Sequence, residues 1–167
     1  LRQEFIDAES APFSPSLGLE FEVIQNLAIL ANISYNFRYP SLNDKYWTLG
    51  GNPDLQPEQG WNGEVGLKYT TQFFTTQATY YRQTIENFIQ WVPVSGVIWS
   101  PQNVKQVSVQ GVDISAGFYN TFNKVLLGLD LGYLFNTSRV TESSIPGDAS
   151  IGKQLIYNPQ NKFTIGY

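Results

Sequence analysis

The chain has 167 residues and a formal net charge of −4, and it contains neither cysteine nor histidine. These absences exclude disulfides, thiolate metal sites, cysteine nucleophiles and the usual general base, so we predict no catalytic residue, no metal site and no cofactor. The acidic balance argues against a nucleic-acid partner. Only 14% of the residues are charged while 15% are aromatic, which suggests a compact all-β protein or a membrane β-barrel.

Apolar and polar residues alternate along most of the chain. In the segment 27–38, for example, Ile29 and Ile33 share one face, while Asn32 and Ser34 share the other. A period of two is typical of a strand with one apolar face. No segment has convincing helical periodicity. We expect nine strands, at about 2–7, 15–24, 27–38, 61–70, 73–91, 104–119, 124–136, 153–158 and 162–167.

The expected connections alternate between short and long. Short turns are predicted at 25–26, 71–72, 120–123 and 159–161, and long loops at 39–60, 92–103 and 137–153. Antiparallel strands joined in this way place every short turn at one end of the sheet. Outer-membrane barrels have this arrangement, with short periplasmic turns and long extracellular loops.

Strand length and aromatic residues also favour a barrel over a soluble β-sandwich. Eleven residues tilted by about 45° cross roughly 25 Å of bilayer. Aromatic residues are expected at both ends of such strands, as in the interfacial belts of membrane proteins: Phe73, Phe74, Phe118 and Phe122 near the short turns, and Tyr35, Phe37, Tyr80, Tyr81, Tyr133 and Phe135 towards the long loops. An open sheet of nine strands would leave unpaired edges in lipid, so we expect these residues to be part of a larger barrel with strands missing at both ends.

Four ordered motifs carry a family resemblance. The segment 51–58 (GNPDLQPE), followed by Glu64-Val65-Gly66, resembles the N-P-x-L-x-P-E … E-x-G pattern of TonB-dependent outer-membrane receptors. The segments 78–89, 103–113 and 154–159 are similar to later parts of the same barrel. The last of these segments resembles the residues before a periplasmic turn. Asp113 stands where that family usually has glutamate. More loosely, Trp91-Val92-Pro93 and 99–103 resemble receptors of the Bacteroidota type.

The resemblance implies an all-β, antiparallel transmembrane β-barrel of 22 strands whose lumen holds an N-terminal plug. Residues 1–167 would form part of its C-terminal half, without the plug, the first strands or the last. It also implies location in the outer membrane of a Gram-negative cell. The implied partners are the TonB–ExbB–ExbD complex acting through an N-terminal TonB box, a nutrient ligand, outer-membrane lipid and, for the Bacteroidota type, a surface lipoprotein.

Candidate binding residues lie in the expected extracellular loops. Exposed aromatic side chains there can stack on a ligand, and an arginine can pair with an anionic one. The candidates are Tyr46, Trp47, Trp91, Trp99 and Arg139. For the aromatic residues the alternative is packing among the loops or at the interfacial belt, and for Arg139 it is a solvated or carboxylate-paired arginine.

The loop motif consists of Asn52, Pro53, Asp54, Leu55, Pro57 and Glu58. Its prolines and carboxylates are expected to fix the path of the loop back into the barrel wall. The alternative is a calcium site using Asp44, Asp54 and Glu58. Elsewhere, Glu20 and Glu22 share the polar face, where we expect them to line the lumen rather than act as a catalytic pair.

The favoured function is TonB-driven import of a scarce, bulky nutrient: siderophore-bound iron, cobalamin, haem or a glycan. No bond of the ligand is broken, so the protein is not expected to be an enzyme. A passive porin or structural barrel and a soluble β-sandwich binding module are the alternatives.

Overall fold

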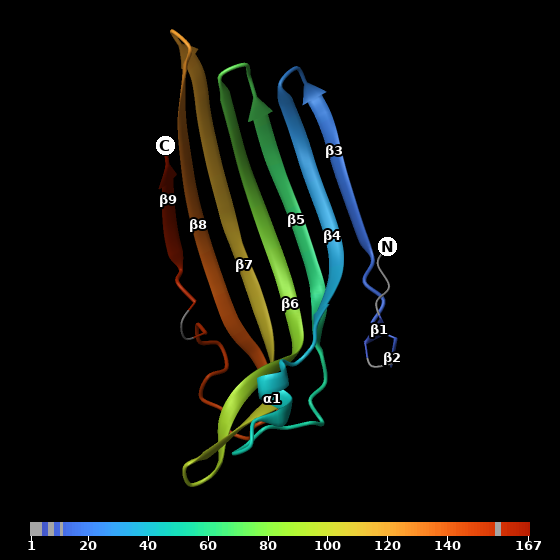
Figure 1. Ribbon diagram of the computed structural model, residues 1–167. Coiled ribbons are helices and arrows are strands. Elements are labelled where there is room, and N and C mark those ends of the chain that lie inside the picture. The colour runs from blue at the N-terminus through green and yellow to red at the C-terminus, as the bar shows by residue number, and fades with distance from the viewer. Residues whose placement is uncertain (1–4, 7–8, 11, 156–157) are drawn as a thin grey trace.

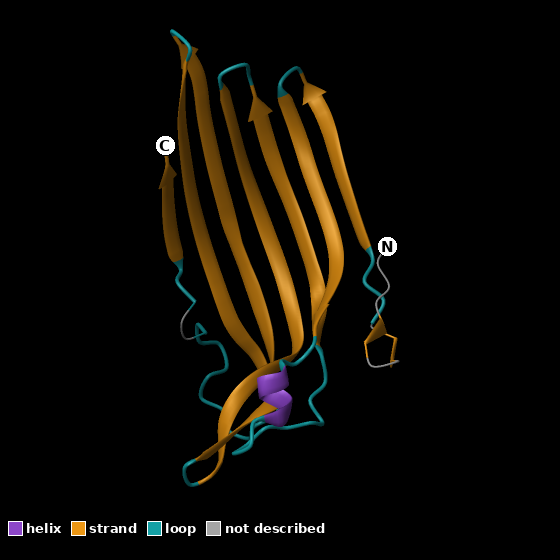
Figure 2. Ribbon diagram, in the orientation of Figure 1, coloured by secondary structure: helices purple, strands orange, loops and turns teal. Residues whose placement is uncertain are grey.

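The computed structural model describes residues 5–6, 9–10, 12–155 and 158–167, which are almost entirely β-structure (Figures 1 and 2). Two very short strands near the N-terminus pair with each other, and the other strands form one antiparallel sheet in chain order. The bounds of the elements are β1 (Phe5–Ile6), β2 (Glu9–Ser10), β3 (Ser16–Ile24), β4 (Leu27–Arg38), α1 (Leu42–Tyr46), β5 (Glu58–Thr70), β6 (Phe74–Ser95), β7 (Ile98–Phe122), β8 (Val125–Ser143) and β9 (Asn161–Gly166). The expected strand 2–7 lies partly outside the described residues.

The two faces of the sheet differ as the alternation predicts. One face carries large, exposed apolar side chains: Leu17, Leu19, Phe21, Ile29, Ile33, Val65, Leu67, Tyr80, Ile114, Phe118, Leu129, Leu131, Phe163 and Ile165. Their register aligns them across all seven strands. The opposite face carries Asn32, Ser34, Glu64, Asp113 and Asp130. An apolar face this exposed suits lipid as its solvent, as the expected transmembrane sheet requires.

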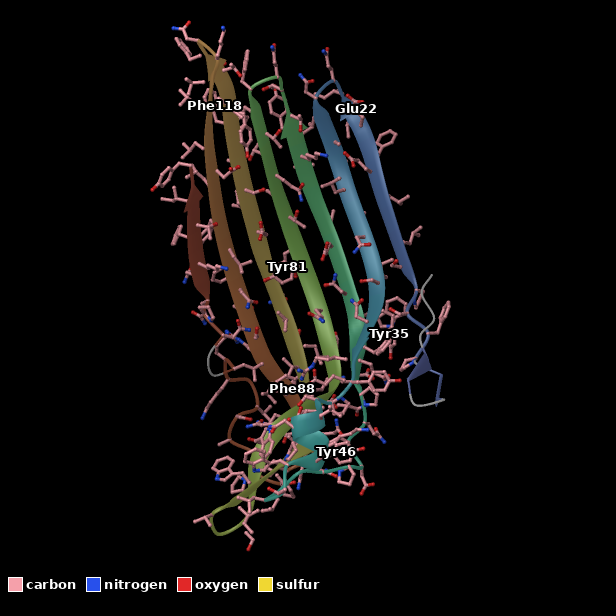
Figure 3. All side chains as sticks on the ribbon, in the orientation of Figure 1. Glu22, Tyr35, Tyr46, Tyr81, Phe88 and Phe118 are labelled. Carbon is pink, nitrogen blue, oxygen red and sulfur yellow. The ribbon has the colours of Figure 1, made fainter. Side chains whose placement is uncertain are left out.

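Three short turns lie at one end of the sheet, shown at the top of Figure 1. Asn26, Asn123 and Lys124 adopt positive φ of 71°, 46° and 71°, as two-residue hairpin turns require. The turn expected at 120–123 therefore lies slightly later, at 123–124. Figure 3 places Phe118 and Glu22 near this end and Tyr46 at the other, while Tyr81 lies near mid-strand rather than towards the loops.

The prediction of a long loop at 92–103 is wrong. β6 and β7 continue as a paired hairpin that turns at Gly96 and Val97, so its two strands have 22 and 25 residues. The ladder includes Pro93 and Pro101, each opposite a tryptophan. Proline is tolerated because this extension reaches beyond β5 and β8, which makes both of its strands edges. The strict alternation of short and long connections therefore fails here.

The long connection expected at 137–153 begins later than predicted, because β8 continues to Ser143 and the next strand starts at Asn161. Residues 153–155 and 158 form no regular strand, and residues 156–157 lie outside the description. Gln154 makes only an isolated antiparallel bridge with Arg139, and Asn161 then pairs with Phe135. The described residues on either side of that gap lie beside β8 and run in the same direction, and the short turn expected at 159–161 is not a turn between strands.

The connection 39–57 contains the five-residue helix α1, which the sequence patterns did not predict. The side chain of Ser41 accepts a hydrogen bond from Asp44 N, and Asp44 bonds back to Ser41 N, forming a capping box. Five residues are too few to show helical periodicity. No helix among the described residues is long and apolar enough to cross a membrane.

Candidate functional site

Three segments gather at the end of the sheet opposite the short turns: the α1 loop (39–57), the distal hairpin (86–105) and the β8–β9 loop (144–160). We call this group the loop cap. Figures 1 and 3 show α1 and Tyr46 beside the bent end of the β6–β7 hairpin, near Phe88. Buried apolar side chains are concentrated here: Leu55, Ile89, Val104, Val107 and Val140. The loop cap therefore has a small core of its own.

The hairpin bends at a bulge around Asn87. The register shifts between Ile85 and Ile89, and Asn87 adopts a positive φ of 55°. Asparagine tolerates this backbone region better than most side chains, and a bulge bends its strand. The amide of Asn103 on β7 donates to the Asn87 carbonyl at 2.6 Å, which fixes the bend from the other strand.

The loop motif attaches the α1 loop to the distal hairpin. Asn52 Nδ2 donates to the Pro101 carbonyl at 3.1 Å. Gln56 and Asn103 exchange two hydrogen bonds of 2.9 and 3.0 Å. Leu55 between them is buried. Gly50 lies so close to the Trp99 carbonyl that an added Cβ would come within 2.1 Å of its oxygen. The α1 loop and the hairpin are consequently joined at several points.

Glu58, the last residue of the motif, is buried and bonded through both oxygens. Arg38 Nε donates to Oε2 at 2.7 Å, and the backbone N–H of Ile89 donates to Oε1 at 2.9 Å. The carboxylate thus joins β4, β5 and the bent part of β6. Among the described residues, no group of three or more acidic side chains is arranged to hold a metal ion.

Trp91 and Asp44 form another contact between the same two segments. Trp91 is half-buried, and its indole N–H donates to Asp44 Oδ1 at 3.0 Å. Partial burial raises the pKa of Asp44, but hydrogen bonds from Ser41 and Trp91 outweigh it and hold that pKa below its usual value. Trp91 is therefore engaged in packing of the loop cap.

A buried ion pair, which the sequence reasoning missed, holds the β8–β9 loop. Lys105 Nζ lies 3.3 Å from Asp148 Oδ2, with side-chain exposures of 5% and 11%. Hydrogen bonds from Ser143 and Ser150, followed by the ammonium of Lys105, lower the pKa of Asp148 well below its usual range. The only sequence signal was the run of serine, glycine and aspartate at 143–150, which is typical of a structured turn.

A polar cluster continues this attachment along β8. Ser138, fully buried, receives a hydrogen bond from Asn158 Nδ2, and its backbone N–H donates to Gln154 Oε1 at 3.0 Å. Asn136 donates to Asn158 Oδ1 at 3.0 Å. These residues belong to the polar face, so part of the β8–β9 loop covers that face near the loop cap.

Three of the candidate aromatic residues are free to contact a ligand. Tyr46, Trp47 and Trp99 are 66%, 50% and 53% exposed. They come from α1, the residue after it, and the start of β7. Arg139 is also exposed, but its register with Ser108 places it on the outward face of the wall. The structure thus brings the three aromatic residues to the loop cap, whereas Arg139 lies on the outside of the sheet.

The polar face between the loop cap and the short turns carries both acidic and basic side chains. Glu20 pairs with Lys68 at 3.2 Å, and Glu22 accepts a hydrogen bond from Asn26 N at 3.3 Å. Tyr119 donates to Asp130. Together with Asp113 and Lys162, these last two residues line an open trough of about 740 Å³. A wall of this kind suits contact with water or another polar surface.

Comparisons with known proteins decide what this sheet belongs to. The family model described as "TonB dependent receptor-like, beta-barrel" matches residues 1–167. The chain belongs to the TonB-dependent receptor β-barrel family. The expected outer-membrane location and the family resemblance are thereby confirmed.

Vitamin B12 transporters are among the curated relatives of this chain. One from Photobacterium profundum is 34% identical over 157 residues, covering 90% of this chain and 24% of that protein. One from Vibrio vulnificus strain YJ016 is 34% identical over 104 residues, covering 62% of this chain and 17% of that protein. The chain thus spans about a quarter or less of the length of these relatives.

Solved structures share the fold at lower identity. The siderophore receptor PirA from Pseudomonas aeruginosa is similar with a TM-score of 0.60 and 21% identity, over 77% of this chain and 25% of that one. The RagAB peptide importer gives 0.63 and 19%, over 85% and 19%. The FrpB iron transporter from Neisseria meningitidis gives 0.61 and 21%, over 94% and 24%. At these identities the likeness shows the transmembrane barrel fold alone.

Proposed function

We propose that this chain is part of a receptor that imports a scarce, bulky nutrient across the outer membrane with energy from the TonB–ExbB–ExbD complex. The supporting observation is the match of the whole chain to the receptor barrel family, together with a wall whose outer face suits lipid. The family consists of transport receptors, and the proposed role involves binding and movement of the ligand without bond cleavage.

The rest of the protein is proposed to complete the barrel. Strands β3 and β9 are the edges of the described sheet, and an unpaired edge is costly in lipid. Further strands, to a total of 22, would pair with them, and an N-terminal plug would fill the lumen against the polar face. A TonB box ahead of the plug would receive the force that opens a passage.

Cobalamin is the first candidate ligand, because the curated relatives at 34% identity are named vitamin B12 transporters. Tyr46, Trp47 and Trp99 would stack on the ligand at the mouth, since exposed aromatic side chains bind large planar or apolar surfaces. Trp91 would support them from beneath through its bond to Asp44. Siderophore-bound iron, haem and glycans are the other candidates, and a surface lipoprotein would be a further partner.

Equilibrium binding of cyanocobalamin to the full-length receptor tests the ligand assignment. We expect saturable binding that weakens roughly tenfold, about 1.4 kcal/mol, in the double variant Trp47→Ala, Trp99→Ala. The matched control is Trp61→Ala, which removes an aromatic residue from the outward face of β5. Equal loss in both variants, or no binding by the wild type, would reject cobalamin or the proposed contact residues.

Conductance separates the receptor from a porin. A plugged barrel should be nearly silent in a planar lipid bilayer, whereas a porin gives a large constitutive current. A steady open pore in the full-length protein would favour the passive barrel.

A further inference from the structure

Asp44 connects α1 to the distal hairpin through all three of its oxygens. Oδ1 accepts a hydrogen bond from the indole N–H of Trp91 at 3.0 Å, and Oδ2 accepts from the backbone N–H and the hydroxyl of Ser41 at 3.1 and 2.6 Å. The backbone carbonyl of Asp44 accepts from the N–H of Asn52 at 2.9 Å. Asp44 is only partly exposed. This residue therefore fixes the start of α1, the loop motif and the hairpin at the same time.

The contacts of Asp44 close into a ring. Trp91 on β6 is the register partner of Pro101 on β7. The Pro101 carbonyl accepts from Asn52 Nδ2 at 3.1 Å, and the N–H of Asn52 donates back to Asp44. We call Asp44, Trp91, Pro101 and Asn52 the anchor ring. Contacts at separate points fix both the distance and the angle between two segments, whereas one contact would act as a pivot.

Two exposed tryptophans lie next to the anchor ring, one on each segment. Trp99 lies two residues before Pro101 on β7, and therefore on the same face of that strand. Trp47 directly follows α1, and its carbonyl accepts from the N–H groups of Gly50 and Gly51 at 3.2 and 2.7 Å. The close approach of Gly50 to the Trp99 carbonyl leaves no room for a side chain. The placement of Trp47 relative to Trp99 thus depends on how the two segments are joined.

We propose that Asp44 is a positioning residue for ligand binding, which sets the geometry between Trp47 and Trp99 by holding Trp91 against α1. The inference rests on the proposed function, because it takes the two exposed tryptophans as ligand contacts. Asp44 acts through its neighbours, since its oxygens are already bonded within the loop cap. Aromatic surfaces that are arranged before binding lose less conformational entropy when a large ligand stacks on them. The anchor ring would therefore raise affinity by preorganisation.

The anchor ring requires a carboxylate at position 44. An ionised carboxylate accepts hydrogen bonds through both oxygens, whereas an amide has one oxygen and one NH₂ group. In Asp44→Asn the NH₂ group must face either the Trp91 N–H or the Ser41 N–H, and both of these groups are donors. A substitution that keeps the volume of the side chain would thus remove one of these two contacts.

Binding of cyanocobalamin to the full-length receptor tests this role. Asp44→Asn should weaken binding roughly tenfold while leaving the urea midpoint of the barrel unchanged. The matched control is Asp54→Asn, because Asp54 is an exposed carboxylate of the same loop whose side chain has no hydrogen bond among the described residues. This control should bind like the wild type.

A double-mutant cycle tests whether Asp44 acts through Trp91. Trp91→Phe removes the indole N–H and should weaken binding to a similar extent as Asp44→Asn. The variant that carries both substitutions should bind no more weakly than either single variant, because both break the same contact. Additive losses in the double variant would show that the two residues act separately.

Fluorine NMR of receptor labelled with fluorotryptophan supplies a readout that a merely structural role would not change. The resonances are assigned with single Trp→Phe variants. Asp44→Asn should shift the resonances of Trp47 and Trp99, while that of Trp61, on the outward face of β5, should stay in place.

Wild-type affinity in Asp44→Asn, equal loss in Asp54→Asn, or additive losses in the double variant would overturn the proposal. If the wild type does not bind cyanocobalamin, the ligand assignment fails and the NMR comparison decides the positioning role. Unchanged resonances of Trp47 and Trp99 in Asp44→Asn would then overturn it. Tight binding by the wild type with no effect of Asp44→Asn leaves the proposed import function standing.

Discussion

An arginine placed on the lipid-facing side of the wall should prevent stable insertion, while the same residue on the lumen side should not. Leu131 lies near the middle of the apolar part of β8 and is 45% exposed on the outward face. Its neighbour in register is Ala116 on β7. The adjacent residue Ser115 belongs to the opposite face, opposite Gly132, and its side chain has no hydrogen bond among the described residues.

The magnitude follows from the position of Leu131. An arginine on the lipid face near the bilayer midplane costs about 2–4 kcal/mol, which corresponds to a decrease of roughly 30-fold to several hundredfold in the folding equilibrium. Ser115→Arg leaves the charge in a polar lumen, where surface substitutions usually change stability by about 0.5 kcal/mol or less. The two variants place the same charge one register position apart, on opposite faces of the sheet.

The assay is refolding of the full-length receptor into lipid vesicles, scored by heat-modifiable gel mobility and by urea titration. Leu131→Arg should unfold at lower urea concentration and give less folded protein, while Ser115→Arg should match the wild type. The reverse result would exchange the inside and outside of the wall, as a one-residue register slip does. Normal folding of both variants would show that these strands do not face lipid.

Three further predictions concern the loop cap. Glu58→Ala removes the carboxylate that accepts hydrogen bonds from Arg38 and from the Ile89 N–H. Amide hydrogens of the loop 39–57 should then exchange faster, by an amount corresponding to about 1–3 kcal/mol. The control Gln56→Ala, at an exposed side chain, should not have this effect. Asn87→Gly should be tolerated at its φ of 55°, but Asn87→Val should cost about 1–2 kcal/mol and loosen the hairpin bend, seen as faster exchange of residues 86–105. The folded pKa of Asp148 is lowered, so its stabilising effect is present above the usual Asp range and is lost only as pH falls through the lowered value. Limited proteolysis should therefore find the β8–β9 loop equally protected at pH 7 and roughly pH 4, whereas Lys105→Met should expose the loop at both. Cleavage of the wild-type loop at pH 5 but not at pH 7 would contradict the assignment.

The membrane wall could be predicted from the sequence because it depends on a local pattern. Alternation with period two places Ile29 or Leu129 on one face whatever the neighbouring strand is, and the turns at 25–26 and 71–72 follow from the ends of that pattern. The structure confirms these features with small changes in strand ends. Lipid and lumen impose the alternation directly on each residue.

The loop cap could not be predicted in the same way, because long-range contacts decide its structure. A loop was expected at 92–103, yet Pro93 and Pro101 are accommodated in a two-stranded extension whose outer edges need no backbone donor. Lys105 and Asp148 are 43 positions apart, and nothing local indicates that they pair in the interior. Trp91 was a reasonable ligand candidate, but only the fold reveals that its N–H is already bonded to Asp44.

The most direct test of the central claim is uptake of radiolabelled cyanocobalamin by cells that carry the full-length receptor as their only cobalamin transporter in the outer membrane. The measurement compares cells with functional TonB and cells without it at a low external concentration. The account predicts accumulation only when TonB is present. Equal uptake in both strains would contradict energy-driven import through this barrel.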